Sequence, residues 1–188
     1  MKGFYLSIGK QGSGKTLFIT KLVSENLKNR KVFSNYHLTK IPYERISFNK
    51  EAYKEILDDT EYNNIIDILE MLERDVNYFN NSIMLLDEIH VDLDSLDYMK
   101  GSNRKLQKFF SQLRKRNILL LGTTQYIMNL DVRIRRQCMN VFEMKHLKKD
   151  IFEVTTHDID GYYSTPISTY LIDLSDYYDS YNTNEIIL

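Results

Sequence analysis

A glycine-rich stretch near the start of the chain constrains its fold more than any other feature. The stretch runs Gly9-Lys10-Gln11-Gly12-Ser13-Gly14-Lys15-Thr16 and matches G-x-x-x-x-G-K-[ST] at every fixed position. Residues 4–8 before it read as a short buried strand, and residues 17–27 after it read as a helix. In such a turn, successive backbone N–H groups point inward and bind phosphate oxygens. The pattern therefore predicts a nucleotide-binding P-loop, with a chance glycine-rich turn as the alternative.

Two side chains of this stretch have predicted contacts with a bound nucleoside triphosphate. We expect Lys15 to reach the β- and γ-phosphates, and we expect the Thr16 hydroxyl to ligate Mg²⁺. The other residues of the stretch, from Gly9 to Gly14, supply the backbone that holds the phosphates. ATP and Mg²⁺ are therefore the expected cofactors.

A second motif, Ile83-Met84-Leu85-Leu86-Asp87-Glu88, places two acids after an apolar run. Consecutive apolar residues indicate a strand covered on both faces, as in the middle of a parallel sheet. We expect Asp87 to hold Mg²⁺ opposite Thr16, and Glu88 to act on the attacking water as a general base. Kinases with a P-loop also need an acceptor site, whereas an acid directly after the magnesium aspartate is more typical of P-loop proteins that activate water. This pair of acids therefore favours ATP hydrolysis. A solvated strand end is the alternative.

A third apolar run, residues 118–121, leads through Gly122-Thr123-Thr124 to Gln125. If this strand lies beside the strand that ends at Asp87, Gln125 can hydrogen-bond the γ-phosphate or the attacking water. The alternative is a strand-end amide that caps a loop. Before this strand, residues 102–116 are predicted to be a helix, because the apolar residues Leu106, Phe109, Phe110 and Leu113 follow helical spacing.

Strands and helices alternate along the chain, which predicts an α/β protein with a mainly parallel central sheet flanked by helices. The remaining predicted elements are a strand at 32–34, helices at 49–58 and 65–79, a hairpin from 138–147 and 150–156, and a strand at 169–174. At 188 residues we expect one domain over 1–188, with a core at about 3–145 and with C-terminal strands and an acidic tail at 146–188.

Charge is distributed unevenly, although the formal net charge is only −1. Residues 100–136 contain ten basic residues and one acid, whereas residues 150–188 contain eight acids and neither lysine nor arginine. The basic residues are Lys100, Arg104, Lys105, Lys108, Arg114, Lys115, Arg116, Arg133, Arg135 and Arg136. Such segregation creates a local field that favours an anionic partner. Solvated helix faces with one catalytic arginine are the alternative.

Other features of the sequence limit the cellular compartments in which we expect the protein. The chain has one cysteine, Cys138, so an intrachain disulfide is excluded and a reducing compartment is expected. The first residues run directly into the predicted strand at Phe4, so we expect no signal peptide. The sequence holds no uncharged apolar stretch long enough to span a bilayer, so we expect a soluble protein without a transmembrane segment.

The order and spacing of these motifs resemble the HerA–FtsK superfamily of P-loop ATPases. The resemblance rests on GKQGSGKT, IMLLDE, LRKRN, LLLGTTQ and LDVRIRR, and it covers roughly residues 3–145. Within the superfamily, the chain looks like the genome-packaging ATPases of tailless, membrane-containing viruses and like the zonula occludens toxin-type assembly ATPases of filamentous phages. The resemblance implies a three-layer RecA/FtsK-like P-loop NTPase fold.

The resemblance also implies roles for individual residues. Lys15 and Thr16 match the phosphate and Mg²⁺ positions, Asp87 and Glu88 the magnesium aspartate and the catalytic glutamate, and Gln125 the glutamine sensor. Arginine fingers in this group precede the strand that ends at the sensor and act on the neighbouring subunit. Arg114 and Arg116 are therefore the candidates, with Arg133, Arg135 and Arg136 as alternatives.

Three functions remain open at this point. The first is an ATP-driven motor that packages double-stranded DNA into a preformed viral particle. The resemblance then implies a homo-oligomeric ring, typically a hexamer, a capsid or membrane-vertex partner, and a location in the host cytoplasm, the virion or both. The second is an ATPase for the assembly and extrusion of filamentous phage. The third is a nucleotide-binding switch that does not hydrolyse its ligand.

Overall fold

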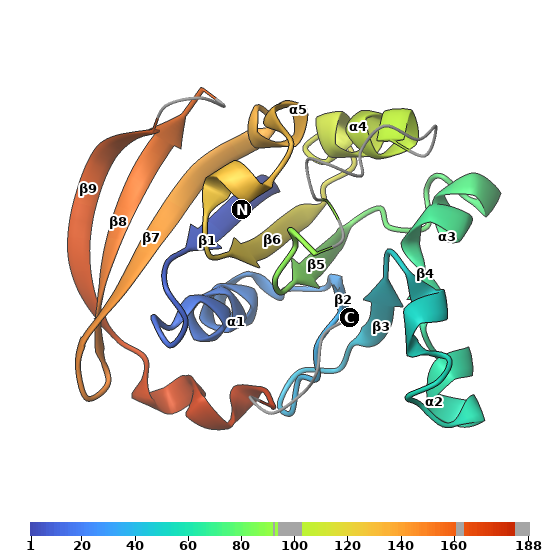
Figure 1. Ribbon diagram of the computed structural model, residues 1–188, viewed down its shortest axis with the longest axis horizontal. Coiled ribbons are helices and arrows are strands. Elements are labelled where there is room, and N and C mark those ends of the chain that lie inside the picture. Colours follow the sequence, from blue (N-terminus) through green and yellow to red (C-terminus); the bar gives the residue numbers. More distant parts are fainter. Residues whose placement is uncertain (92, 94–102, 161–163, 183–188) are drawn as a thin grey trace.

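The computed structural model describes residues 1–91, 93, 103–160 and 164–182 of the chain, and of residues 103–105 it describes the backbone (Figure 1). The strands are β1 Gly3–Ile8, β2 Lys31–Ser34, β3 Glu44–Ser47, β4 Ile66–Asp67, β5 Ser82–Leu86, β6 Leu119–Thr124, β7 Cys138–Lys148, β8 Ile151–Ile159 and β9 Ser164–Asp173. The α-helices are α1 Lys15–Asn26, α2 Asp59–Asn63, α3 Ile68–Arg74, α4 Asn103–Gln112 and α5 Val132–Arg135. Short 3-10 helices are η1 Lys50–Tyr53, η2 Ile127–Asn129 and η3 Ser175–Ser180.

All described strands join one sheet, in the order β4-β3-β2-β5-β6-β1-β7-β8-β9. The neighbours from β4 to β7 run parallel, and β8 and β9 extend the sheet antiparallel. The predicted mainly parallel sheet of an α/β protein is thus confirmed. The order also places β6 between β1 and β5, with Leu86 of β5 in register with Gly122 of β6.

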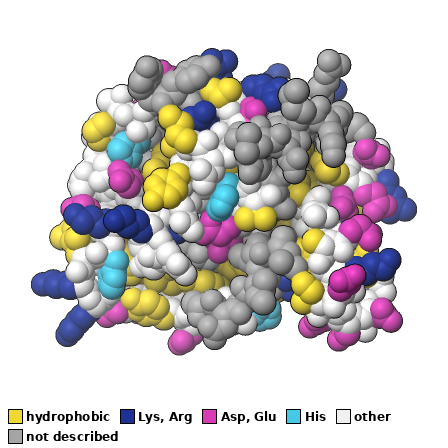
Figure 2. Space-filling model, in the orientation of Figure 1, with side chains coloured by type: hydrophobic (Ala, Val, Ile, Leu, Met, Phe, Trp, Pro, Cys, Tyr) yellow, Lys and Arg dark blue, Asp and Glu magenta, His cyan; other side chains and the backbone are white. Residues whose placement is uncertain are grey.

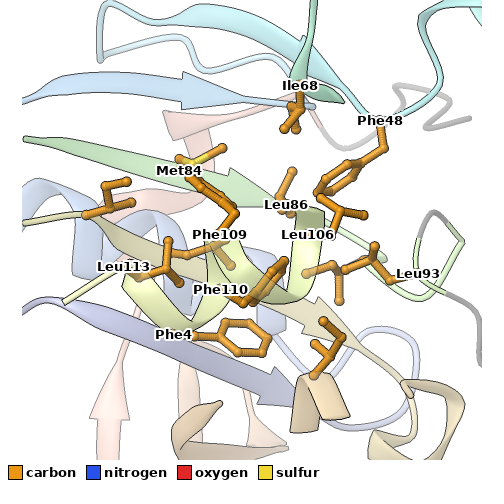
Figure 3. Close-up of a cluster of buried hydrophobic side chains, with 14 of the residues drawn as sticks. Phe4, Phe48, Ile68, Met84, Leu86, Leu93, Leu106, Phe109, Phe110 and Leu113 are labelled. Atoms are coloured by element: carbon orange, nitrogen blue, oxygen red, sulfur yellow. The ribbon is translucent and has the colours of Figure 1, made fainter. Parts of the chain in front are cut away.

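Two hydrophobic cores cover the two faces of this sheet. Because successive strand side chains point to opposite faces, Ile83 and Leu85 of β5 pack with α1, whereas Met84 and Leu86 pack with α4. Figure 3 shows Phe109 and Phe110 of α4, and Leu113 directly after it, directed towards the strands that carry Phe4 and Met84. The predicted spacing of the apolar residues is confirmed, since Leu106, Phe109, Phe110 and Leu113 are all buried, but α4 ends at Gln112 and not at residue 116 as predicted. The fold has the three layers expected from the sequence.

The strand predictions at 32–34 and at 138–156 are confirmed. β7 pairs with β1 and then forms a hairpin with β8. The last strand is longer than predicted, because β9 begins at Ser164 and pairs with β8 along its whole length. The predicted start of this strand at residue 169 was therefore wrong.

Two helix predictions were wrong. Residues 49–58 form only the short helix η1 followed by turns, because the Asn49 side chain makes no capping bond. Asp58 instead takes an extended conformation, and its side chain accepts hydrogen bonds from Thr60 N and Glu61 N to begin α2.

The predicted long helix at 65–79 is also interrupted. Its first part holds β4, whose last residue Asp67 is extended and caps α3 through a hydrogen bond from Glu70 N. Asp75 is extended as well and ends α3. Of the apolar residues with helical spacing in this stretch, Ile65 and Phe79 are buried, but Val76 is 47% exposed. The side-chain cap from Asp67 and the extended backbone at Asp75 thus divide a stripe that has helical spacing.

The C-terminal segment returns to the middle of the molecule. Helix η3 lies against α1, and Leu38 forms an isolated antiparallel bridge with Tyr181. The Tyr181 ring meets Tyr36 edge-on at 5.9 Å, and burial raises the pKa of Tyr181 to about 12. In the part of the chain that the structure describes, no helix is long and apolar enough to cross a bilayer.

Candidate active site

The predicted P-loop connects β1 to α1 at the carboxyl edge of the sheet. Gly14 is the N-cap of α1 and adopts φ +88°, a left-handed conformation that favours glycine. A Cβ atom at Gly14 would lie 2.6 Å from Cε1 of Phe152, so β8 also leaves no room for a side chain. The loop is therefore fixed both by backbone conformation and by close packing.

Lys15 is the first residue of α1, and its side chain returns over the loop. Its Nζ donates a hydrogen bond to Lys10 O at 3.2 Å and lies 4.0 Å from Oε1 of Glu88. The side chain is only 6% exposed. Beside it, Ser13 Oγ is buried and has no hydrogen-bond partner among the described residues. A buried cation and an unpaired hydroxyl in one loop suit a phosphate ligand.

Thr16 and Asp87 meet across the sheet edge. Thr16 Oγ1 donates a hydrogen bond to Asp87 Oδ1 at 2.9 Å, and the Thr123 hydroxyl donates to the same oxygen. Burial raises the pKa of Asp87, and these two hydrogen bonds and the Lys15 charge oppose that rise. One hydroxyl and one carboxylate fit Mg²⁺ that also binds nucleotide phosphates, because Mg²⁺ takes few protein oxygens in such sites.

Glu88 follows in a strained backbone conformation, with φ +47°. The turn is held by β6, since Glu88 N donates to Thr123 Oγ1 and Ile89 N donates to Thr123 O, both at 2.9 Å. Burial raises the pKa of Glu88, while the Lys15 charge lowers it. Its Oε2 is buried and has no hydrogen-bond partner among the described residues. A strained residue with a free carboxylate oxygen is typical of a catalytic position.

Asn35, which the sequence analysis missed, holds the Asp87 backbone in place. Its side chain accepts a hydrogen bond from Asp87 N at 2.8 Å and donates one to Asp87 O at 3.0 Å. Asn35 is buried and directly follows β2, the neighbour of β5. A polar residue directly after a predicted strand was the available signal, because ligands bind at this edge of parallel sheets.

Gln125 lies at the end of β6, between the strands that carry the P-loop and Asp87. The condition stated for Gln125, that its strand lies beside the strand that ends before Asp87, is met because β6 pairs with β5. Gln125 is exposed and lines a pocket of about 660 Å³ together with the first half of the P-loop. The pocket is also lined by Ile8, Tyr126, Ile127, Met128, Glu143, Met144, Lys145 and His146. Its volume is in the range of ligand sites.

Comparisons with known proteins agree with this geometry. The model of the ATPase family associated with various cellular activities (AAA) matches residues 5–146, which include the P-loop, Asp87, Glu88 and Gln125. The chain belongs to the AAA family. It is a P-loop ATPase, and ATP is its nucleotide. No curated protein matches the sequence.

Solved structures show the same fold at low sequence identity. The N-terminal domain of zonular occludens toxin from Neisseria meningitidis has a TM-score of 0.67 and 22% identity, over 97% of this chain and all of that one. The genome-packaging NTPase B204 of Sulfolobus turreted icosahedral virus 2, solved with ATP-γS, has a TM-score of 0.53 and 12% identity, over 89% and 97%. The resemblance of this AAA ATPase to these two kinds of protein, predicted from sequence, is confirmed.

The candidate finger arginines lie away from the P-loop of their own subunit. Arg114 and Arg116 precede β6, at the edge of the sheet opposite to the edge that carries Asp87. Arg116 donates from Nε and Nη2 to Gln112 Oε1 and from Nη1 to Val76 O. The Arg114 side chain makes no hydrogen bond or ion pair within the described residues, and Arg114 is exposed. In this AAA ATPase, Arg114 is therefore the less constrained of the two.

The other arginines follow Gln125 and precede β7. Arg133 donates to both oxygens of Asp131, the N-cap of α5, from Nε and Nη2 at 2.9 Å each. Arg135 and Arg136 end the same short helix. Of the remaining basic run, Lys108 is exposed on α4, whereas Lys100 and the side chains of Arg104 and Lys105 lie outside the described part of the structure.

Proposed function

We propose that this AAA ATPase is a DNA-translocating motor that packages viral double-stranded DNA into a preformed particle. The observation that carries the DNA-binding part is the segregation of charge. Residues 100–136 hold ten basic residues and one acid. Figure 2 shows lysine and arginine side chains near α5 and around the turn between β7 and β8, whereas acidic side chains gather over α2 and α3. Lysine and arginine contacts to phosphates give sequence-independent binding, which suits a translocating motor.

Hydrolysis is assigned to the residues at the carboxyl edge of the sheet. Thr16 and Asp87 would hold Mg²⁺, which neutralises charge on the phosphates when bound. Lys15 would bind the β- and γ-phosphates from its buried position, in place of its bond to Lys10 O. Glu88 would accept a proton from the attacking water through its unpaired Oε2. Gln125, on the strand between them, would orient the water or the γ-phosphate.

A homo-oligomeric ring completes this site, with a hexamer as the proposed size. The supporting observation is that Arg114 is exposed and precedes β6, at the edge of the sheet opposite to the edge that carries its own P-loop. An arginine finger in trans contributes about 10³ to 10⁵ in rate. The proposed partners are double-stranded DNA and a capsid or membrane-vertex protein, and the proposed location is the host cytoplasm, the virion or both.

A second candidate is an ATPase for filamentous phage assembly. It is favoured by the higher TM-score and identity to the zonular occludens toxin domain, 0.67 and 22% against 0.53 and 12% for B204. Both candidates need ATP hydrolysis, so the active-site assignments are shared. The nucleic acid separates them: a packaging motor responds to double-stranded DNA, and a filamentous phage motor responds to single-stranded DNA.

The test of the DNA-binding part is the salt dependence of binding. Reversal of Arg104, Lys105 and Lys108 to glutamate should weaken binding to double-stranded DNA. The slope of log K against log salt should fall by about 0.9 for each phosphate contact that is lost. The matched control reverses three exposed lysines elsewhere, Lys54, Lys148 and Lys149, with the same change in net charge. An equal slope in wild type, test variant and control would contradict the assignment of this surface.

A further inference from the structure

His90 lies two residues after Glu88, in the turn that follows β5 and is hydrogen-bonded to the end of β6. The turn is anchored by Ile89, which is fully buried and whose N–H donates to Thr123 O. The His90 side chain is partly buried, with 26% of its surface exposed. In the sequence, His90 belongs to the run Asp87-Glu88-Ile89-His90 that follows β5.

One nitrogen of the His90 ring, Nδ1, contacts both Glu88 and Thr124. Nδ1 lies 3.3 Å from Oε2 of Glu88 and 3.3 Å from Oγ1 of Thr124. The Thr124 hydroxyl donates its proton to Tyr126 O at 3.2 Å. Because a hydroxyl has one proton, Thr124 Oγ1 accepts from His90, which places a hydrogen on Nδ1. The same N–H group then faces the unpaired oxygen of Glu88.

The Glu88 carboxylate therefore has one neighbour at each oxygen. Lys15 Nζ lies 4.0 Å from Oε1, and His90 Nδ1 lies 3.3 Å from Oε2. Attraction between Glu88 and Lys15 would draw the carboxylate onto the ammonium group, which the phosphates need. A contact from His90 at the other oxygen opposes this movement.

We propose that His90 is a positioning residue for hydrolysis: it holds Glu88 away from Lys15 and ties it to the strand end that carries Gln125. The connection to this strand end is the contact between His90 and Thr124, the residue directly before Gln125. This inference rests on the proposed role of Glu88 as the general base. It concerns turnover more than nucleotide affinity, because neither the backbone of the P-loop nor Thr16 contacts His90 in any bond described above, and His90 acts on Lys15 only through Glu88.

The test uses substitutions that separate the two ring nitrogens. Asparagine places an amide nitrogen close to the position of Nδ1, whereas glutamine places it close to that of Nε2. We expect His90→Ala and His90→Gln to lower kcat for DNA-free hydrolysis of MgATP by about 10-fold to 100-fold, the usual effect of losing a polar contact with a charged group. We expect His90→Asn to retain kcat and ATP affinity within about threefold, and Tm to change little in all three. In His90→Ala and His90→Gln, ATP affinity should fall by a smaller factor than kcat, because only Glu88 connects His90 to Lys15.

A double-mutant cycle with Thr124→Val tests the tie itself. Valine keeps the shape of threonine and removes the hydroxyl, so the single variant should lower kcat, and in the His90→Ala background it should lower kcat no further. The inference is overturned if His90→Ala keeps wild-type kcat, if asparagine and glutamine behave alike, or if the two substitutions are additive. Glu88→Gln is the reference: if it hydrolyses ATP normally, the proposed role of Glu88 fails, and if it is inactive while His90→Ala is active, only this inference fails.

Discussion

Thr16 Oγ1 donates a hydrogen bond to Asp87 Oδ1 at 2.9 Å, which joins two motifs 71 residues apart in the sequence. The bond pre-forms the pair of oxygens assigned to Mg²⁺. Thr16→Ala removes the hydroxyl, and we expect it to weaken binding of ATP in the presence of Mg²⁺ by at least about tenfold. Thr16→Ser keeps the hydroxyl and should bind within about threefold of wild type. Titration with and without Mg²⁺ measures both; equal affinity of the alanine variant and wild type for MgATP would contradict the assignment.

The P-loop glycines provide a second prediction, because two of them differ in their surroundings. A Cβ at Gly12 meets nothing within 4 Å, whereas a Cβ at Gly14 lies 2.6 Å from the Phe152 ring. Both have positive φ, so Gly12→Ala should cost about 1 kcal/mol of stability through strain alone. Gly14→Ala should cost at least about 1 kcal/mol more, because overpacking adds to strain. Denaturant unfolding measures the difference; equal losses would show that the loop moves away from Phe152 without cost.

The third prediction separates the two candidate arginine fingers. We expect Arg114→Ala to lower ATP turnover without loss of stability, because its side chain is exposed and makes no bond within the described residues. Arg116→Ala should instead lower stability by about 1–3 kcal/mol, because the Arg116 guanidinium joins Gln112 to Val76 O.

Mixing subunits tests whether Arg114 acts in trans. Arg114→Ala subunits keep a complete P-loop site, and Lys15→Ala subunits keep the finger, so a mixture of the two should recover turnover that neither has alone. A mixture as inactive as its components would contradict a finger in trans from Arg114. Recovery with Arg116→Ala in place of Arg114→Ala would assign the finger to Arg116.

The sequence predicted those site residues that belong to a recognisable local motif and missed those that depend on contacts between distant segments. The P-loop and the strand before Asp87 were predicted because glycine spacing and a run of apolar residues are local signals. Asn35 and Thr123 were missed because their roles arise only when β2, β5 and β6 lie side by side. The contacts of His90 arise in the same way. The single polar side chains of these residues have no distinctive spacing in the sequence.

The fold was predicted best where burial is complete and least well between residues 43 and 79. β5 is buried at every position, so its apolar run was unambiguous. β3 has only four residues and begins with the partly exposed Glu44 and Arg45, so it shows no clear alternation. The apolar stripe at 65–79 suggested one helix, but the cap from Asp67 decided where the helix begins. Side-chain capping bonds override periodicity in such short elements.

A fourth prediction concerns stability and pH. The hydrogen bonds from Arg133 lower the pKa of Asp131 below its usual value of 3.8. A lowered pKa stabilises the fold above the unfolded-state pKa, and this stabilisation is lost as pH falls through the folded-state value. Asp131→Asn keeps an N-cap oxygen and removes the charge. Because the Arg133 side chain is half exposed, we expect a loss of about 0.5–1 kcal/mol at pH 7 that shrinks below about pH 4.

Urea unfolding of wild type and Asp131→Asn between pH 3 and pH 7 measures this difference. Asp58→Asn is the matched control, since Asp58 caps α2 and receives hydrogen bonds only from the backbone, at Thr60 N and Glu61 N. A difference for Asp131→Asn that stays constant over the whole pH range would show that the Arg133 pair does not contribute to stability through its charge.

The most direct test of the account is steady-state ATP hydrolysis by wild type and Glu88→Gln, each with and without double-stranded DNA. Glutamine keeps the size of Glu88 and cannot accept the proton of the attacking water. We predict that wild type hydrolyses ATP and turns over faster with DNA, and that Glu88→Gln binds ATP with near wild-type affinity and hydrolyses it at least about 100-fold more slowly in both conditions. Unchanged turnover in Glu88→Gln would contradict the assigned chemistry, and wild-type turnover that is insensitive to DNA would contradict the motor.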